Sequence, residues 1–178
     1  ISPQNLFVTY DGTTKVLDFG IARARKRGVK SDAGVVKGKF AYLTPEALEG
    51  AELDARADQF ALGIVLFELT TLQRLFQKPS DAEVLRAVME CRIPRPSSLV
   101  PGYPMALEDI LLRTLARDRE HRYSDCDALR ADLETFADRY GKPHSSRRLG
   151  TFVRSLFPEH AKAQPGAAEA PSADAEAK

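Results

Sequence analysis

The sequence begins ISPQNLFVTYDGTTKVLDFG (residues 1–20), and this stretch decides the fold. Its two short runs, at residues 6–8 and 15–17, flank the pair Asp11-Gly12. That pair is typical of the tight turn between two antiparallel strands. We therefore predict a β-hairpin at the N-terminus of the chain.

Asn5 and Asp18 stand at the two ends of this hairpin. A tight turn brings their side-chain oxygens toward one point. Two hard oxygen ligands that leave room for water and phosphate suit a nucleotide-bound magnesium ion. If each residue is taken alone, a turn or helix-cap role is about equally expected.

The composition is that of a soluble globular protein. The 178 residues include 26 basic and 25 acidic side chains, so the overall charge points to neither nucleic acid nor membrane. The longest apolar run, residues 60–67, ends at Glu68 and is shorter than the ~18 apolar residues of a membrane span. Cys91 and Cys126 lack zinc or redox spacing, so we expect inert thiols and a cytoplasmic location.

Beyond the hairpin, residues 21–39 are polar, basic and unperiodic, which predicts a long loop. The rest of the folded chain reads as helical. The segment DQFALGIVLFELTT (residues 58–71) is apolar on all faces, which a helix tolerates only when protein surrounds it. We expect this segment to be the central helix.

Three further helices have recognisable starts. Ser80 and Glu83 form a capping box, Pro104 is expected to begin the second helix, and Ser124 is expected to cap the third. Pro94 and Pro96 are expected to close the first of these helices.

A short amphipathic helix is expected after the break at Gly141 and Pro143. Its apolar face comprises Leu149, Phe152, Val153, Leu156 and Phe157. We divide the chain into a main domain at residues 1–140, a linker with this helix at 141–157, and a disordered tail at 158–178.

An ordered series of motifs resembles the C-terminal lobe of a protein kinase. The series is SPQN (2–5), DFG (18–20), TPE (44–46), DQFALG (58–63) and Arg122. It is similar to the bacterial, eukaryotic-like serine/threonine kinases in particular, and tyrosine specificity is less expected. The resemblance covers about residues 1–140 and implies the α+β kinase fold, here mainly α-helical with one hairpin. It also implies ATP and Mg²⁺ as cofactors and a protein substrate. The charge balance and the short apolar runs predict no nucleic acid partner and no membrane segment.

In the family, the catalytic loop reads H-R-D-x-K-P-x-N, so the catalytic Asp would stand immediately before Ile1. The glycine-rich loop and the phosphate-binding lysine also lie outside this sequence. We therefore expect a kinase fragment that is inactive alone. The alternatives are a non-catalytic, kinase-derived binding module and a broken gene product.

The resemblance also assigns roles to single residues. Asn5 and Asp18 would bind magnesium, and Phe7 with Leu17 would form the floor under the adenine. For Phe7 and Leu17, a plain place in the strand core is an equally good interpretation.

Three residues would be structural. Glu46 and Arg122 resemble the buried ion pair of the family, which is costly to break. Asp58 resembles the acid that anchors the catalytic loop, although a carboxylate in a first helical turn is favourable in any case.

Ser31 is the only serine or threonine between Gly20 and Thr44, and we predict Ser31 to be a regulatory phosphosite. The basic run RARKRGVK (residues 23–30) is either a solvated face or a cradle for that phosphate.

The last hypothesis concerns an exchange of two side chains. Ser2 stands where the family has the lysine that meets the transferred phosphate, and Lys39 stands where it has threonine. We expect Lys39 to supply the positive charge and Ser2 to hydrogen-bond the catalytic Asp. The alternative is a surface Lys39 and a neutral replacement at Ser2.

Overall fold

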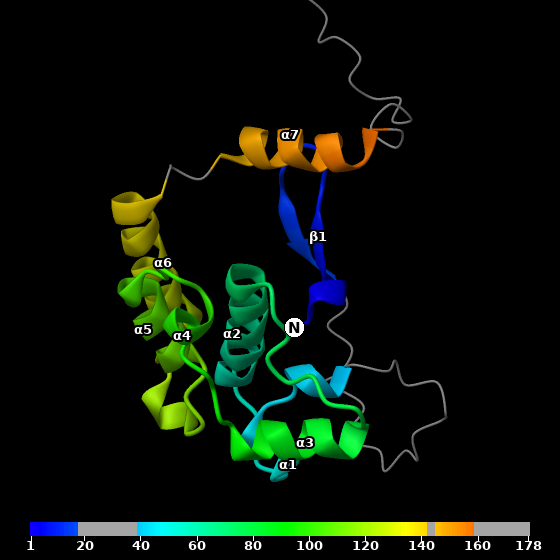
Figure 1. Cartoon of the computed structure of the whole chain (residues 1–178), viewed down its shortest axis with the longest axis vertical. Helices are drawn as coiled ribbons and strands as arrows, with labels where there is room; N and C mark the ends of the chain where they lie inside the picture. The colour runs from blue at the N-terminus through cyan, green and yellow to red at the C-terminus, as the bar shows by residue number, and fades with distance from the viewer. Residues whose placement is uncertain (18–38, 142–144, 159–178) are drawn as a thin grey trace, which may run out of the picture. The chain divides into compact units, whose positions relative to one another are not determined.

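The computed structural model describes residues 1–17, 39–141 and 145–158 (Figure 1). In chain order its elements are η1 Pro3–Asn5, β1 Leu6–Val8, β2 Thr14–Val16, η3 Lys39–Tyr42, α1 Pro45–Leu48, α2 Arg56–Thr71, α3 Asp81–Glu90, α4 Pro96–Leu99, α5 Met105–Thr114, η4 Arg119–His121, α6 Cys126–Tyr140 and α7 Ser146–Leu156. The contacts divide the chain into two units. One contains residues 1–6 and 16–144, and the other contains residues 7–15 and the segment from Ser145 on.

The predicted hairpin is present, with its second strand one residue earlier than expected, at Thr14–Val16. A five-residue turn sets this register. The amide of Thr9 donates to the carbonyl of Thr13 at 2.9 Å, and the amide of Thr13 donates to Oδ1 of Asp11 at 3.0 Å. Gly12 has a φ of +85°, which glycine adopts without strain.

In the first unit the core forms around α2, as the sequence predicts. Phe60 and Ile64 are fully buried, and α2 is packed by η3, α4 and α5. A Cβ at Gly63 would lie 3.0 Å from side-chain atoms of Leu115 and Thr114. The missing side chain at Gly63 therefore lets the end of α5 approach α2 closely.

The helix starts follow the sequence in two of three cases. The capping box is present: the amide of Glu83 donates to Oγ of Ser80, and the amide of Ser80 to Oε2 of Glu83, both at 3.3 Å. Pro104 directly precedes α5. The prediction that Ser124 caps α6 is wrong, because Asp125 is the N-cap and accepts from the amide of Ala128 at 2.8 Å.

The two prolines after α3 also behave differently from the prediction. The helix ends at Glu90, before either proline, with Cys91 in the left-handed conformation at φ +47°. Pro96 instead begins the short helix α4. Proline fits the first turn of a helix because it needs no amide hydrogen there.

In the second unit, the predicted amphipathic helix is present as α7 and packs on the hairpin turn (Figure 1). A Cβ at Gly150 would lie 2.5 Å from the carbonyl oxygen of Tyr10, and one at Gly12 would overlap the backbone of Ser146. Arg154 donates to the same Tyr10 carbonyl. Backbone therefore meets backbone at this contact, which we call the glycine seam (Gly12 and Gly150).

Among the helices that the structure describes, none combines the length and the hydrophobicity that crossing a bilayer would need.

Candidate functional site

Asn5 lies at the end of η1, where the hairpin begins, and is buried. Oγ of Ser2, which is also buried, donates to Oδ1 of Asn5 at 2.6 Å. This hydrogen bond fixes the carboxamide and leaves its oxygen one further lone pair for a ligand. The Ser2 proton, which we expected on the catalytic Asp, is thus given to Asn5 in this structure.

Leu17 brings the far end of the hairpin next to Asn5. Its amide donates to the backbone carbonyl of Asn5 at 2.8 Å. Asp18, the next residue along the chain, lies outside the described residues, as does Ser31. Lys39 begins η3, and its side chain is likewise not described.

Phe7 and Leu17 are not core residues. Their exposed fractions are 49% and 44%. The interpretation of these two positions as plain strand core is therefore wrong, and both apolar side chains are available to a ligand or another segment.

Asp58 lies in the first turn of α2, where a carboxylate is favourable. Its Oδ1 is 3.7 Å from the amino nitrogen of Ile1, and its side chain is 67% exposed. The neighbouring Gln59 is fully buried, and both polar atoms of its amide lack a hydrogen-bond partner in the part of the chain that the structure describes. Each buried donor or acceptor group without a hydrogen-bond partner costs about 1–3 kcal/mol of stability.

Glu46 and Arg122 form a buried bidentate ion pair. Nη1 and Nη2 of Arg122 donate to Oε1 and Oε2 of Glu46 at 2.7 and 2.9 Å. The Arg122 side chain is fully buried. Its other three N–H groups donate to the carbonyls of Ala116, Arg56 and Arg117, at 2.8, 3.0 and 3.1 Å. All five guanidinium donors are thus satisfied, and three separate segments, at Glu46, at Arg56 and at residues 116–117, are tied to one cation.

The pKa of Glu46 reflects two opposing effects. Burial raises the pKa, but the hydrogen bonds from Arg122 and the charge of its guanidinium outweigh burial, so the pKa lies below its usual value. Glu46 is therefore ionised at neutral pH, as the ion pair requires.

A second polar cluster, at Tyr42, was not predicted. The Tyr42 hydroxyl donates to Oε2 of Glu68 at 2.8 Å, Arg74 donates to that hydroxyl, and Nη1 of Arg74 lies 3.3 Å from Oε2 of Glu68. Burial and the hydrogen bond to Glu68 raise the pKa of Tyr42. The cluster fastens η3 to the end of α2, and only the polar character of Glu68 within an apolar helix signals it in the sequence.

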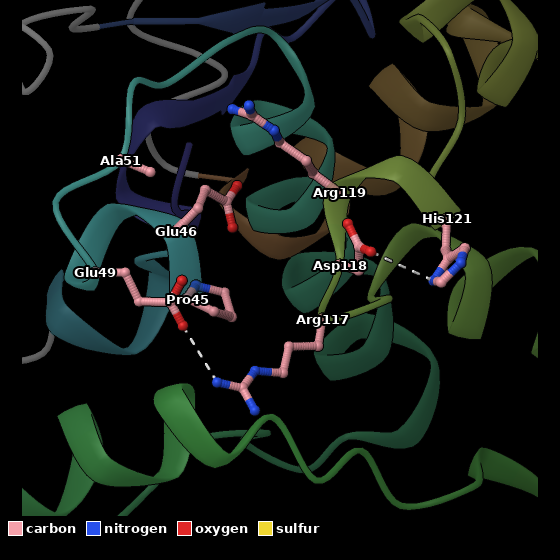
Figure 2. A pocket seen from close by; sticks show the side chains of 8 residues that line it. All are labelled: Pro45, Glu46, Glu49, Ala51, Arg117, Asp118, Arg119 and His121. Atoms are coloured by element: carbon pink, nitrogen blue, oxygen red, sulfur yellow. Dashed lines mark hydrogen bonds and ion pairs between the residues drawn. The ribbon is translucent and has the colours of Figure 1, made fainter.

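A pocket of about 540 Å³ is lined in part by Glu46, the ion-pair partner of Arg122 (Figure 2). Residues of α1, the following loop and the segment around η4 line it. Arg117 points across to Glu49, with 3.2 Å between Nη2 and Oε1, and His121 faces Asp118 at 4.0 Å. Glu49 and Arg117 thus pair across the pocket, whereas Glu46 and Arg119 pair with Arg122, Asp54 and Glu120, which do not line it.

No group of three or more metal-ligating side chains is found in the described ranges 1–17, 39–141 and 145–158. Both cysteines are free, and burial raises the pKa of Cys91 to about 11. The Cys91 thiol is therefore protonated at neutral pH, as expected of an inert cysteine.

With this geometry in view, the comparisons with known proteins decide the family. The sequence profile described as "Protein kinase domain" matches residues 1–133. The chain belongs to the protein kinase family. Its mainly helical structure with a single hairpin is that of the C-terminal lobe, as predicted.

Bacterial protein kinases are among its similar proteins. A tyrosine-protein kinase, MasK of Myxococcus xanthus, is 44% identical over 159 residues, which cover 89% of this chain and 25% of that protein. The serine/threonine-protein kinase PknL of Mycobacterium tuberculosis is 31% identical over 143 residues, covering 80% of this chain and 36% of PknL. PrkC of Bacillus subtilis, a serine/threonine-protein kinase, is 34% identical over 138 residues, covering 78% and 21%. The chain thus spans about a fifth to a third of the length of these relatives.

Proposed function

We propose that this chain is the C-terminal lobe of a serine/threonine protein kinase, which transfers the terminal phosphoryl group of ATP to a protein hydroxyl. The observation that carries the proposal is the position of Asn5. Its backbone carbonyl is held 2.8 Å from the amide of Leu17, the residue before Asp18. Asn5 therefore makes this backbone contact itself, and Asp18, the other expected magnesium ligand, is the next residue after Leu17 in the chain.

In this proposal Asn5 and Asp18 bind Mg²⁺, and Phe7 with Leu17 contact the adenine. The free lone pair of the Asn5 oxygen fits a hard cation, and the Ser2 hydroxyl orients that oxygen. Magnesium neutralises charge on the phosphates when it is bound. Lys39 supplies a further positive charge, and Ser2 acts on the site through Asn5.

Glu46, Arg122 and Asp58 are proposed as structural residues. The ion pair holds the end of the loop at α1 against the segment after α5. Asp58 and the unpartnered amide of Gln59 lie next to each other at the start of α2. We propose that polar groups outside the described residues hydrogen-bond to the Asp58 carboxylate and to the Gln59 amide. The backbone of an anchored catalytic loop would provide such groups.

Specificity for serine and threonine is a separate proposal. The segments ISPQN (1–5) and GKFAYLTPEAL (38–48) resemble the serine/threonine branch, to which PknL and PrkC belong by name. The name of MasK points to tyrosine instead. Ser31 is proposed as the regulatory phosphosite of the loop, because five basic residues lie at positions 23–30.

The isolated chain is expected to be inactive. Its sequence contains neither H-R-D nor G-x-G-x-x-G, so it lacks the catalytic base and the loop that covers the phosphates. Phosphoryl transfer depends on the positioning of the reactants and on charge stabilisation. A C-terminal lobe alone forms only one side of the active-site cleft and provides neither.

A chimera tests the proposal. The chain replaces the matched residues of the myxococcal kinase, and phosphoamino acid analysis identifies the product. We expect phosphoserine or phosphothreonine, with activity lost on Asn5→Ala or Asp18→Asn and absent from the isolated chain. Phosphotyrosine alone would refute the specificity, and activity that survives both substitutions would refute the site.

A further pair of variants in the same chimera tests Lys39. Loss of a transition-state charge costs about 10²- to 10³-fold in turnover. We expect a loss on this scale for Lys39→Ala, with partial recovery when Ser2→Lys is combined with Lys39→Thr. If Lys39→Ala changes turnover less than about threefold, Lys39 is a surface residue.

A further inference from the structure

Within the second unit, helix α7 has an apolar stripe that is left exposed. The exposed fractions of Phe152 and Leu156 are 58% and 54%, and Leu149 in the same stripe is half-buried. Positions 149, 152 and 156 follow the i, i+3, i+7 spacing that places side chains on one face. The stripe lies beyond residue 133, where the match to the kinase family ends.

The glycine seam fixes which way this stripe faces. Gly150 is buried against the hairpin turn. At about 100° per residue, Phe152 lies roughly 160° around the helix from Gly150. The contact within the second unit therefore turns the stripe away from the hairpin.

The polar part of α7 is entirely cationic or neutral. The helix contains Arg147, Arg148 and Arg154 and no acidic residue, and the sequence from Arg139 to Pro158 has none either. No carboxylate among the described residues pairs with any of these three arginines in the structure. Arg147 and Arg148 lie in the first turn, where the helix dipole disfavours cations. An external anionic partner would compensate this unfavourable placement.

The size of the stripe indicates what kind of partner fits. An 11-residue helix is about 16 Å long and about 10 Å wide. One face of it provides far less than the roughly 800 Å² per partner of a stable protein–protein interface. A lipid surface has no such minimum, because apolar side chains and cations contribute to its binding residue by residue.

We propose that α7 is an interfacial helix that binds an anionic lipid surface, with Phe152 and Leu156 inserted among the acyl chains and Arg148 at the headgroups. Arg148 precedes Phe152 by one turn, so cation and apolar stripe meet the surface together. The glycine seam would hold the hairpin against the bound helix. This inference does not depend on the proposed kinase activity.

Vesicle sedimentation with the 178-residue chain tests the proposal. We expect binding to vesicles of equal parts phosphatidylglycerol and phosphatidylcholine, weakening with added salt, and little binding to phosphatidylcholine alone. Each arginine near an anionic surface is worth roughly fivefold in affinity. Arg148→Gln should thus weaken binding about fivefold, and Phe152→Ser with Leu156→Ser by at least about tenfold.

Two exposed residues on other helices or loops provide matched controls. Leu69 is 68% exposed and the Arg92 side chain is 87% exposed, so Leu69→Ser and Arg92→Gln should leave binding unchanged. The chain contains no tryptophan, so Phe152→Trp adds a single tryptophan. Its emission should shift to the blue on anionic vesicles.

Equal binding to both kinds of vesicle, no binding to either, or an unshifted emission of the vesicle-bound Phe152→Trp variant would overturn the proposal. Self-association in sedimentation equilibrium that Phe152→Ser with Leu156→Ser abolishes would assign the stripe to a second copy of the chain instead.

Discussion

Removal of the Glu46 carboxylate is the most informative perturbation of the first unit. Glu46→Ala deletes two charge-assisted hydrogen bonds, of 2.7 and 2.9 Å, and leaves the fully buried guanidinium of Arg122 without an anion. Breaking a buried pair in this way costs about 3–5 kcal/mol. Arg122 keeps its three backbone carbonyl partners, so we expect the lower half of that range.

The chain supplies a matched control in the same region. Glu49 pairs with Arg117 at 3.2 Å, but the two side chains are 47% and 58% exposed. Exposed pairs contribute about 0–1 kcal/mol, so Glu49→Ala should barely change stability. Urea unfolding followed by circular dichroism measures both variants, with the midpoint shifting at constant slope. A loss below about 1 kcal/mol for Glu46→Ala would refute the reasoning.

The same pair makes a pH prediction. The pKa of Glu46 is lower in the folded chain than its ordinary value of 4.5, so its ionisation stabilises the fold above that pH. As the pH falls below 4.5 and through the folded-state pKa, this contribution is lost. The stability difference between the wild type and Glu46→Gln should therefore be full at neutral pH and narrow in acid. A difference that does not depend on pH would show that hydrogen-bond geometry, and not charge, sets the effect.

Three further predictions concern helix ends and close contacts. Ser80→Ala should cost about 1 kcal/mol in urea unfolding, because the capping box is lost, and no change would mean that the exposed cap is frayed. Gly63→Val should cost about 1–3 kcal/mol by the same measurement, since its side chain would overlap that of Leu115; an unchanged midpoint would show that α5 moves away freely. Gly150→Val should separate α7 from the hairpin turn and speed hydrogen exchange at the Gly12 and Thr13 amides, with Thr151→Val as control. Unchanged exchange would argue against the glycine seam.

The local parts of the fold could be predicted from sequence because each depends on residues within a turn or two. The central helix is signalled by a continuous apolar run, and the capping box by two residues three positions apart. Ser124 and Asp125 are both good cap residues, so sequence alone could not decide between them. In the structure the N-cap is Asp125, whose carboxylate accepts a hydrogen bond from the amide of Ala128.

Contacts between distant segments were harder to predict. Glu108 is fully buried and accepts hydrogen bonds from Arg95 and the amide of Ser97, both at 2.8 Å. The sequence pattern predicts that a charged residue in an amphipathic helix is exposed. Burial of Glu108 is favourable only because residues 95–97 supply its hydrogen-bond donors. The hydrogen bond from Ser2 to Asn5 could not be predicted from the family resemblance, because the family has a lysine at that place. By contrast, the motif series predicted the pairing of Glu46 with Arg122, although the two residues are 76 positions apart.

The central position of α2 has a consequence for biosynthesis. The helix is covered by η3, which precedes it in the chain, and by α4 and α5, which follow it. A ribosome adds roughly 5 to 20 residues per second, so for some seconds the nascent chain exposes an apolar helix whose later cover has not yet been made. During that interval Phe60 and Ile64 would be attractive to a chaperone or to a neighbouring nascent chain. The helix that organises the finished lobe is thus also the segment that most needs protection while the lobe is being synthesised.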